Sequence, residues 1–173
     1  LRPVSGQVSN RISLLRVSQA AEKAIFVTSV PMFAKLPWER LLRLVSTLHR
    51  RTYSHGEVIV GQDETPQGLF IVCEGRCTVA RRLTYDEHGR TLSRQMHLET
   101  LMARDTYGGD ALLHGILRSR TSLIAETDVT LLFVSRADFC PSHLTEEALR
   151  MLKLNAKLYR PNDDLLRQRH YQV

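Results

Sequence analysis

The chain has 173 residues, of which 43% are hydrophobic and 24% are charged. This length excludes two full-sized domains, and the composition is typical of a globular protein rather than a disordered one. The 24 lysines and arginines outnumber the 18 acidic residues, which gives a formal charge of +6. Such a surplus favours nucleic acid, an anionic membrane or a phosphorylated ligand as partner. Because the first residue is Leu1, we expect a fragment of a longer polypeptide.

The basic surplus is concentrated at the start of the chain. Residues 1–60 hold nine basic and three acidic groups, whereas residues 61–140 hold nine and eleven. Basic residues spread along N-terminal helices are typical of a solvated face, so the charge does not by itself indicate a nucleic-acid footprint.

The sequence contains three cysteines, Cys73, Cys77 and Cys140. Three is an odd number and too few for a disulfide framework, which favours a reducing, cytoplasmic compartment. The spacing of the first two is a weak metal signal without a second pair, so we expect buried apolar thiols and neither metal nor other cofactor. No apolar run approaches the roughly 18 residues of a membrane span, so we expect no direct membrane insertion.

Two helices are expected before the first strand. Apolar residues at helical spacing predict one over 11–28, which Pro31 prevents from continuing. A second is predicted from Pro37 through Leu48, with proline at its first position. Its apolar face comprises Leu41, Leu44, Val45 and Leu48.

From Arg51 onward, short β-type runs alternate with glycines. The predicted strands are 58–60, 69–72, 78–80, 96–101, 122–125 and 129–134. Residues 81–95 predict a hairpin with its tip at Asp86–Gly89. Strands at this spacing predict a β-barrel or roll.

The last part of the chain returns to helix. Ser135 or Asp138 is expected to cap a short turn that ends before Pro141. Thr145 is the expected N-cap of the next helix, since glutamates follow it in the first turn. Asn162 and Asp163 are expected to cap a final helical segment over 164–171.

Catalytic signatures are missing from the sequence. No GxSxG, HExxH or GxxxxGK[ST] motif occurs, and the seven histidines never form the close pairs that metal-binding β-barrels use. We therefore expect that the protein is not an enzyme.

The segment over 105–115 indicates an anion site. Gly108 and Gly109 would let the backbone approach a ligand closely, and Asp110–Leu113 predicts a short helix that Gly115 terminates. Free amide groups would then point out of the glycine end. A downstream arginine would supply charge and bidentate donors to a phosphate. The arginines that follow are Arg118 and Arg120.

The order of these elements, taken with a distributed set of residues, resembles the cyclic nucleotide-binding domain family over roughly residues 30–155. The residues that carry this resemblance are Phe33, Leu36, Leu41, Leu44, Tyr53, Gly56, Ile59, Leu69–Val72, Gly75, Asp105, Tyr107, Gly108, Ala111–Leu113, Asp128–Leu131, Asp138 and Phe139. The resemblance implies a mainly β fold, an eight-stranded β-roll (a jelly roll or double-stranded β-helix) with flanking α-helices at both ends. We expect a helical lead-in over 1–30, the roll over 31–144, and lid and tail helices over 145–173.

The same resemblance implies a phosphate-binding cassette. The implied ligand-binding residues are Tyr107, Gly108, Gly109, Asp110, Ala111, Leu112, Arg118, Arg120, Thr121 and Ser122. The phosphate would lie on the amides of 108–112, and Arg120 or Arg118 would neutralise it.

The cassette departs from the family pattern at two positions. The family's glutamate, which takes the ribose 2′-hydroxyl, is replaced by Gly109, and Asp110 comes one residue late, where we expect it to cap the short helix. Counting back from the turn at 125–128 places Ser119 where the family has its phosphate arginine, with Arg118 and Arg120 on either side.

The resemblance implies a regulatory domain that binds cAMP, cGMP or a related purine nucleotide and relays occupancy to an effector outside this fragment. A bacterial transcription activator shares the fold, but only 33 residues follow Cys140, too few for a DNA reader, so we expect no DNA partner. The alternative is an interaction module that has lost its ligand. Its contacts would come from Tyr159, Leu165, Leu166 and Tyr171, which ordinary helix-face packing also explains.

Overall fold

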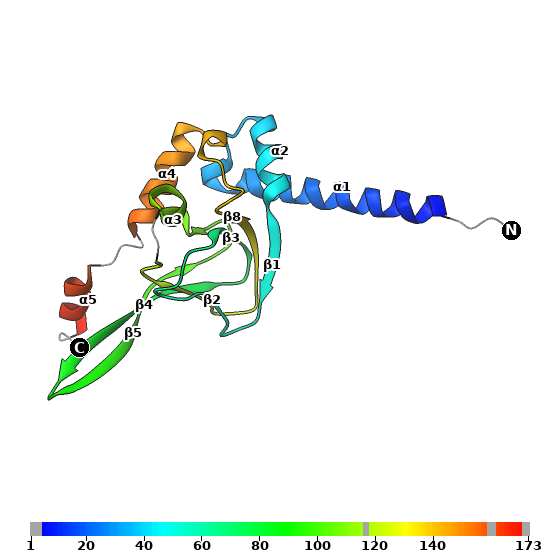
Figure 1. Ribbon diagram of the computed structural model, residues 1–173. Helices are drawn as coiled ribbons and strands as arrows, with labels where there is room; N and C mark the ends of the chain where they lie inside the picture. The colour runs from blue at the N-terminus through cyan, green and yellow to red at the C-terminus, as the bar shows by residue number, and fades with distance from the viewer. Residues whose placement is uncertain (1–4, 116–117, 159–161, 171–173) are drawn as a thin grey trace.

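The computed structural model describes residues 5–115, 118–158 and 162–170, so Tyr159 and Tyr171 lie outside the described residues. Eight strands form two four-stranded antiparallel sheets that face each other as a β-roll, with helices before and after it (Figure 1). This architecture confirms the mainly β, eight-stranded roll with flanking helices that the sequence predicts.

Two α-helices precede the strands, one short helix lies between the sixth and seventh strands, and two helices follow the last strand. The strands are β1 (His49–Tyr53), β2 (Val58–Val60), β3 (Gly68–Glu74), β4 (Cys77–Glu87), β5 (Arg90–Leu101), β6 (Thr106–Tyr107), β7 (Ser122–Ala125) and β8 (Val129–Ser135). The helices are α1 (Ser5–Ser29), α2 (Trp38–Thr47), α3 (Gly109–His114), α4 (Glu146–Leu158) and α5 (Asp163–His170), with 3-10 turns at Pro31–Phe33 and Pro141–His143.

The first sheet has the order β1-β8-β3-β6 and the second the order β2-β7-β4-β5. Phe70 and Phe133 lie opposite each other on β3 and β8, with ring centroids 4.8 Å apart, inside an apolar cluster between the sheets. A second apolar cluster joins α1, α2 and α4 to the outer face of β3 and β8. The expected apolar face of α2 belongs to it, because Leu41, Leu44, Val45 and Leu48 are all buried.

Several local predictions are confirmed by hydrogen bonds. Thr145 Oγ1 accepts from the Ala148 amide at 3.1 Å and caps α4. Asn162 Oδ1 accepts from the Asp164 amide at 3.0 Å and caps α5. The β4–β5 hairpin turns at His88 and Gly89, whose φ values of 51° and 75° are both left-handed, as a tight two-residue turn requires.

Other elements differ from expectation. Helix α1 begins at Ser5 rather than at residue 11 and extends away from the roll (Figure 1), with Val17 and Ile25 exposed. Strands β1 and β6 were not predicted, because β1 contains no apolar run and β6 has only two residues. None of the described helices is long and apolar enough to cross a membrane.

We expect Phe33→Ala to destabilise the fold strongly, because Phe33 is fully buried where the flanking helices meet. The free energy of unfolding in urea should fall by about 3–5 kcal/mol. The matched control is Trp38→Ala, since Trp38 is 64% exposed and its loss should change stability by only about 0.5 kcal/mol. Equal losses for the two variants would contradict this packing.

Candidate functional site

Gly108 stands where β6 passes into α3, and no other residue fits there. Its φ of +95° is left-handed, and a Cβ atom would lie 2.2 Å from the carbonyl oxygen of Gly68. The short helix predicted from the sequence is present as α3, and Gly115 ends it with a φ of +62°. The backbone of Asp110 and Ala111 lies in α3, but their side chains are outside the described residues.

Gly109, which the resemblance places at the position of the family's glutamate, is covered by α4. A Cβ atom at Gly109 would lie 2.5 Å from Cδ1 of Leu152, and Leu152 is fully buried. A second contact ties α4 to β6, since Asn155 Nδ2 donates to Thr106 Oγ1 at 3.3 Å. Leu112 packs against the same apolar cluster as α4. Helix α4 therefore packs directly on the cassette.

The register of residues 118–121 is fixed by backbone hydrogen bonds. The Ser119 amide donates to the Glu64 carbonyl at 2.8 Å, and the Asp63 amide donates to the Ser119 carbonyl at 2.7 Å. The Ser119 side chain is buried, whereas the side chains of Arg118 and Arg120 are exposed. Contact of either arginine with a ligand stays a prediction, and its guanidinium would have to turn away from solvent to make it.

Tyr107 brings β6 and this segment together inside the roll. It pairs with Phe70 of β3, so its ring points to the same face as the Phe70 ring, into the apolar cluster between the sheets. Its hydroxyl lies 3.1 Å from Ser119 Oγ and 2.8 Å from Thr121 Oγ1, and it donates to the Thr121 carbonyl at 3.0 Å. Ser119 Oγ donates to the same carbonyl at 2.7 Å.

This set of three side chains, Tyr107, Ser119 and Thr121, is called the hydroxyl cluster below. Burial raises the pKa of Tyr107, and hydrogen bonds with the other two members only partly oppose that rise. The cluster is therefore uncharged at neutral pH. The remaining predicted residue, Ser122, lies at its edge, where its hydroxyl accepts from the Gln62 amide at 2.9 Å.

Sequence reasoning missed Arg81, which links the cassette to α5. Its Nε and Nη2 atoms donate to the Asp163 carboxylate at 2.9 and 2.8 Å, and its Nη1 atom donates to the Arg120 carbonyl. The hydrogen bond from Arg81 is the main cause that holds the pKa of Asp163 below its ordinary value. On the same helix Leu166 is buried, whereas Leu165 is exposed. No sequence motif signals this ion pair, because its partners belong to elements far apart in the chain.

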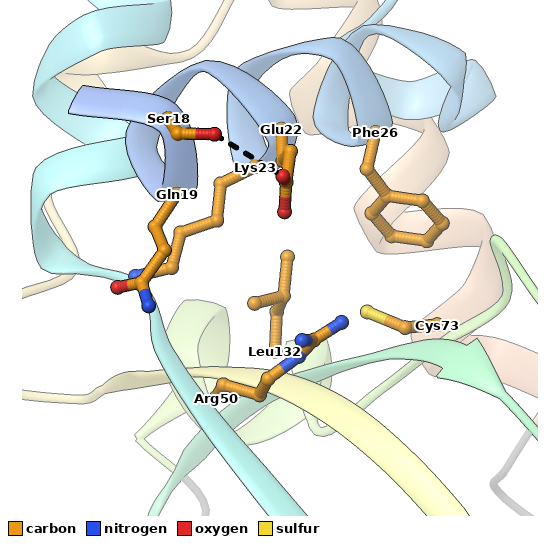
Figure 2. Close-up of a pocket in the computed structure, with 8 residues that line it drawn as sticks. All are labelled: Ser18, Gln19, Glu22, Lys23, Phe26, Arg50, Cys73 and Leu132. Atoms are coloured by element: carbon orange, nitrogen blue, oxygen red, sulfur yellow. Dashed lines mark hydrogen bonds between the residues drawn. The ribbon is translucent and has the colours of Figure 1, made fainter. Parts of the chain in front are cut away.

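A separate cavity of about 440 Å³ lies between α1 and the roll (Figure 2). Its lining residues are Ser18, Gln19, Glu22, Lys23, Phe26, Arg50, Cys73 and Leu132. Lys23 Nζ donates to the Leu48 carbonyl at 2.9 Å and so anchors α1 to the end of α2. Of the cassette residues whose side chains the structure describes, none lines this cavity.

Metal-binding chemistry finds no support in the residues that the structure describes, where no group of three or more His, Cys, Asp or Glu side chains gathers. None of the three cysteines forms a disulfide; Cys77 is buried, Cys73 is half-buried and Cys140 is exposed. Burial raises the pKa of Cys73 and of Cys77 to about 11, so both thiols stay protonated at neutral pH.

A double-mutant cycle would test the contact between the cassette and α4. Gly109→Ala should destabilise the fold by about 1–3 kcal/mol, because its methyl group overlaps Leu152. Leu152→Ala removes that overlap, so the double variant should lose less stability than the two single losses added together, with a coupling above about 0.5 kcal/mol in urea unfolding. Leu154→Ala, at an exposed position of α4, is the control and should show no coupling. Additive losses at positions 109 and 152 would contradict the contact.

Attachment of α5 should depend on pH through Asp163. Its folded pKa is lower than its ordinary value of 3.8, so its stabilising effect is complete above that value and is lost as the pH falls through the folded value. The amide signals of α5 in NMR spectra should therefore move toward random-coil positions at pH values below 3.8. Asp163→Asn should show this change already at neutral pH, whereas Asp164→Asn, at an 83% exposed carboxylate, should not.

Parts of two known proteins are similar in sequence to this chain. Human cGMP-dependent protein kinase 2 is 26% identical over 137 residues, which are 78% of this chain and 17% of the kinase. A cyclic nucleotide-gated potassium channel of Rhizobium etli is 35% identical over 113 residues, which are 65% of this chain and 28% of the channel. The chain thus spans less than a third of the length of these relatives.

Solved structures share the fold. The regulatory subunit of a cAMP-independent protein kinase A from Trypanosoma cruzi, bound to guanosine, has a TM-score of 0.69 at 21% identity and covers 88% of this chain and 52% of its own. The regulatory domain of Toxoplasma gondii PKA with cAMP has a TM-score of 0.69 at 19% identity, over 83% and 51%. The family model described as cyclic nucleotide-binding domain matches residues 50–140, and the chain belongs to that family.

Proposed function

We propose that this domain is a regulatory sensor that takes up a purine nucleotide or nucleoside at the cassette and relays its occupancy to an effector region outside this chain. The observation that carries the proposal is the contact of Leu152 with Gly109. Since α4 rests on the first residue of α3, a ligand that displaces α3 must also displace α4. Two positions of α4 would then be the two states whose populations the ligand shifts.

The relatives support a purine as the ligand. One is named as a cGMP-dependent kinase and another as a cyclic nucleotide-gated channel, and the structural neighbours hold cAMP and guanosine. The three compounds named, cGMP, cAMP and guanosine, share a purine base, and guanosine carries no phosphate. Their effectors differ, so the effector of this chain follows from none of them.

A second signal path is available through Arg81. Its guanidinium donates hydrogen bonds to the carbonyl of Arg120 and to the carboxylate of Asp163. Movement of residues 118–121 would therefore change the attachment of α5. Helix α5 also lies along the β4–β5 hairpin, where Arg167 reaches the Thr84 carbonyl at 3.5 Å (Figure 1). Both C-terminal helices are thus in contact with elements that a ligand would touch.

One observation favours the alternative, an interaction module without a ligand. The buried hydroxyls of the hydroxyl cluster already bond to one another, and no buried side-chain nitrogen or oxygen among the described residues lacks a partner. Under this alternative α4 and α5 would stay docked permanently, and a partner protein would bind their exposed faces.

Calorimetric titration separates the two functions. The sensor requires heat of binding and a raised melting temperature with at least one of cAMP, cGMP, adenosine and guanosine, and α4 amides should change their hydrogen-exchange rates when it binds. Leu152→Ala should weaken this response of α4, and Leu154→Ala should leave it intact. Absence of heat and of a thermal shift with all four at millimolar concentration would contradict the sensor and leave the interaction module.

A further inference from the structure

We propose that the hydroxyl cluster makes this cassette select an uncharged purine nucleoside and discriminate against the cyclic nucleotide. The inference rests on the proposed sensor function and names the chemical class of its ligand. In the family, an arginine at one position of the cassette meets the phosphate. Counting back from the turn at 125–128 places Ser119 at that position in this chain.

A shift of the segment by one residue, which would bring Arg118 or Arg120 to that position, is opposed by hydrogen bonds. Two backbone hydrogen bonds hold Ser119 against residues 63 and 64, and the Ser122 hydroxyl holds the Gln62 amide. A slip by one residue would exchange the inward and outward side chains, but it would break these bonds together with the pairing of β7 with β4 that begins at Ser122. The arginines on either side therefore remain outside.

Among the described residues, no positively charged side chain is buried inside the roll. Besides Tyr107, the buried polar side chains among the described residues are those of Thr106, Ser119 and Thr121, which are all hydroxyls. Arg81 lies nearest in the hydrogen-bond network, but its guanidinium is already paired with Asp163 and bonded to the Arg120 carbonyl. Arg118 donates to the Asp63 carbonyl at 3.3 Å on the outer surface.

The absence of an inward arginine lowers the affinity for a phosphate. A buried phosphate that loses one charge-assisted hydrogen bond loses about 1.5–3 kcal/mol, or roughly 10–100-fold in affinity. A sugar hydroxyl suffers no such loss, because it both donates and accepts and can exchange hydrogen bonds with Tyr107, Ser119 and Thr121. The hydroxyl cluster can therefore form hydrogen bonds with the sugar of a nucleoside, but it supplies no positive charge to a cyclic phosphate.

The test compares affinities by calorimetry for guanosine, adenosine, cGMP and cAMP. Wild type should bind at least one nucleoside at least tenfold more tightly than the corresponding cyclic nucleotide. The double variant Tyr107→Phe with Ser119→Arg removes the phenolic hydroxyl that bonds to Ser119 and adds a guanidinium, so it should gain ten- to a hundredfold in cyclic nucleotide affinity. Arg118→Ala and Arg120→Ala test the two arginines that the resemblance implies as phosphate ligands, and under this inference neither change should alter the wild-type preference.

The outcomes separate this inference from the function on which it rests. Equal or tighter binding of cyclic nucleotides to wild type, or loss of binding in either arginine variant, overturns the inference while the sensor function stands. No binding of any of the four compounds to wild type overturns both. The wild-type affinities and the two arginine variants decide the matter even where the double variant fails to fold, which its circular dichroism spectrum would show.

Discussion

The register of one short segment governs the chemistry of the cassette. Backbone hydrogen bonds between Ser119 and residues 63–64 decide which of three consecutive side chains points into the roll. The segment carries two arginines, and a shift of one position would place either of them inside. Because the bonds select the serine, a segment that is basic in sequence presents a neutral hydroxyl to the interior, and Tyr107 completes the neutral surface around it.

The same segment is in contact with the helices that follow the roll. Leu152 of α4 covers Gly109, and Arg81 joins the Arg120 carbonyl to Asp163 of α5. Glycine at position 109, where the resemblance to the family places a glutamate, leaves the space that Leu152 fills. Absence of a ribose contact from that position and close docking of α4 would then be two consequences of one substitution.

The charge of +6 has little to do with the interior of this site. Among the described basic side chains near the N-terminus, Lys35 pairs with Glu147 of α4, and Arg40 Nη1 donates to the Leu144 carbonyl just before α4. These contacts link the N-terminal part of the chain to the start of α4. Exposed pairs of this kind contribute about 1 kcal/mol or less, so the apolar cluster beneath them supplies most of the attachment.

Local chemistry determined much of the fold in advance. Helical spacing predicts the buried face of α2, a tight turn predicts the β4–β5 hairpin, and side-chain oxygens at Thr145 and Asn162 predict where α4 and α5 begin. Each of these signals depends on residues that are neighbours in sequence. The tertiary structure decided the rest: β1 is a strand because β8 pairs with it, and Leu152 lies on Gly109 because α4 returns to the roll. The inward position of Ser119 likewise depends on hydrogen bonds to a distant segment, which no local pattern specifies.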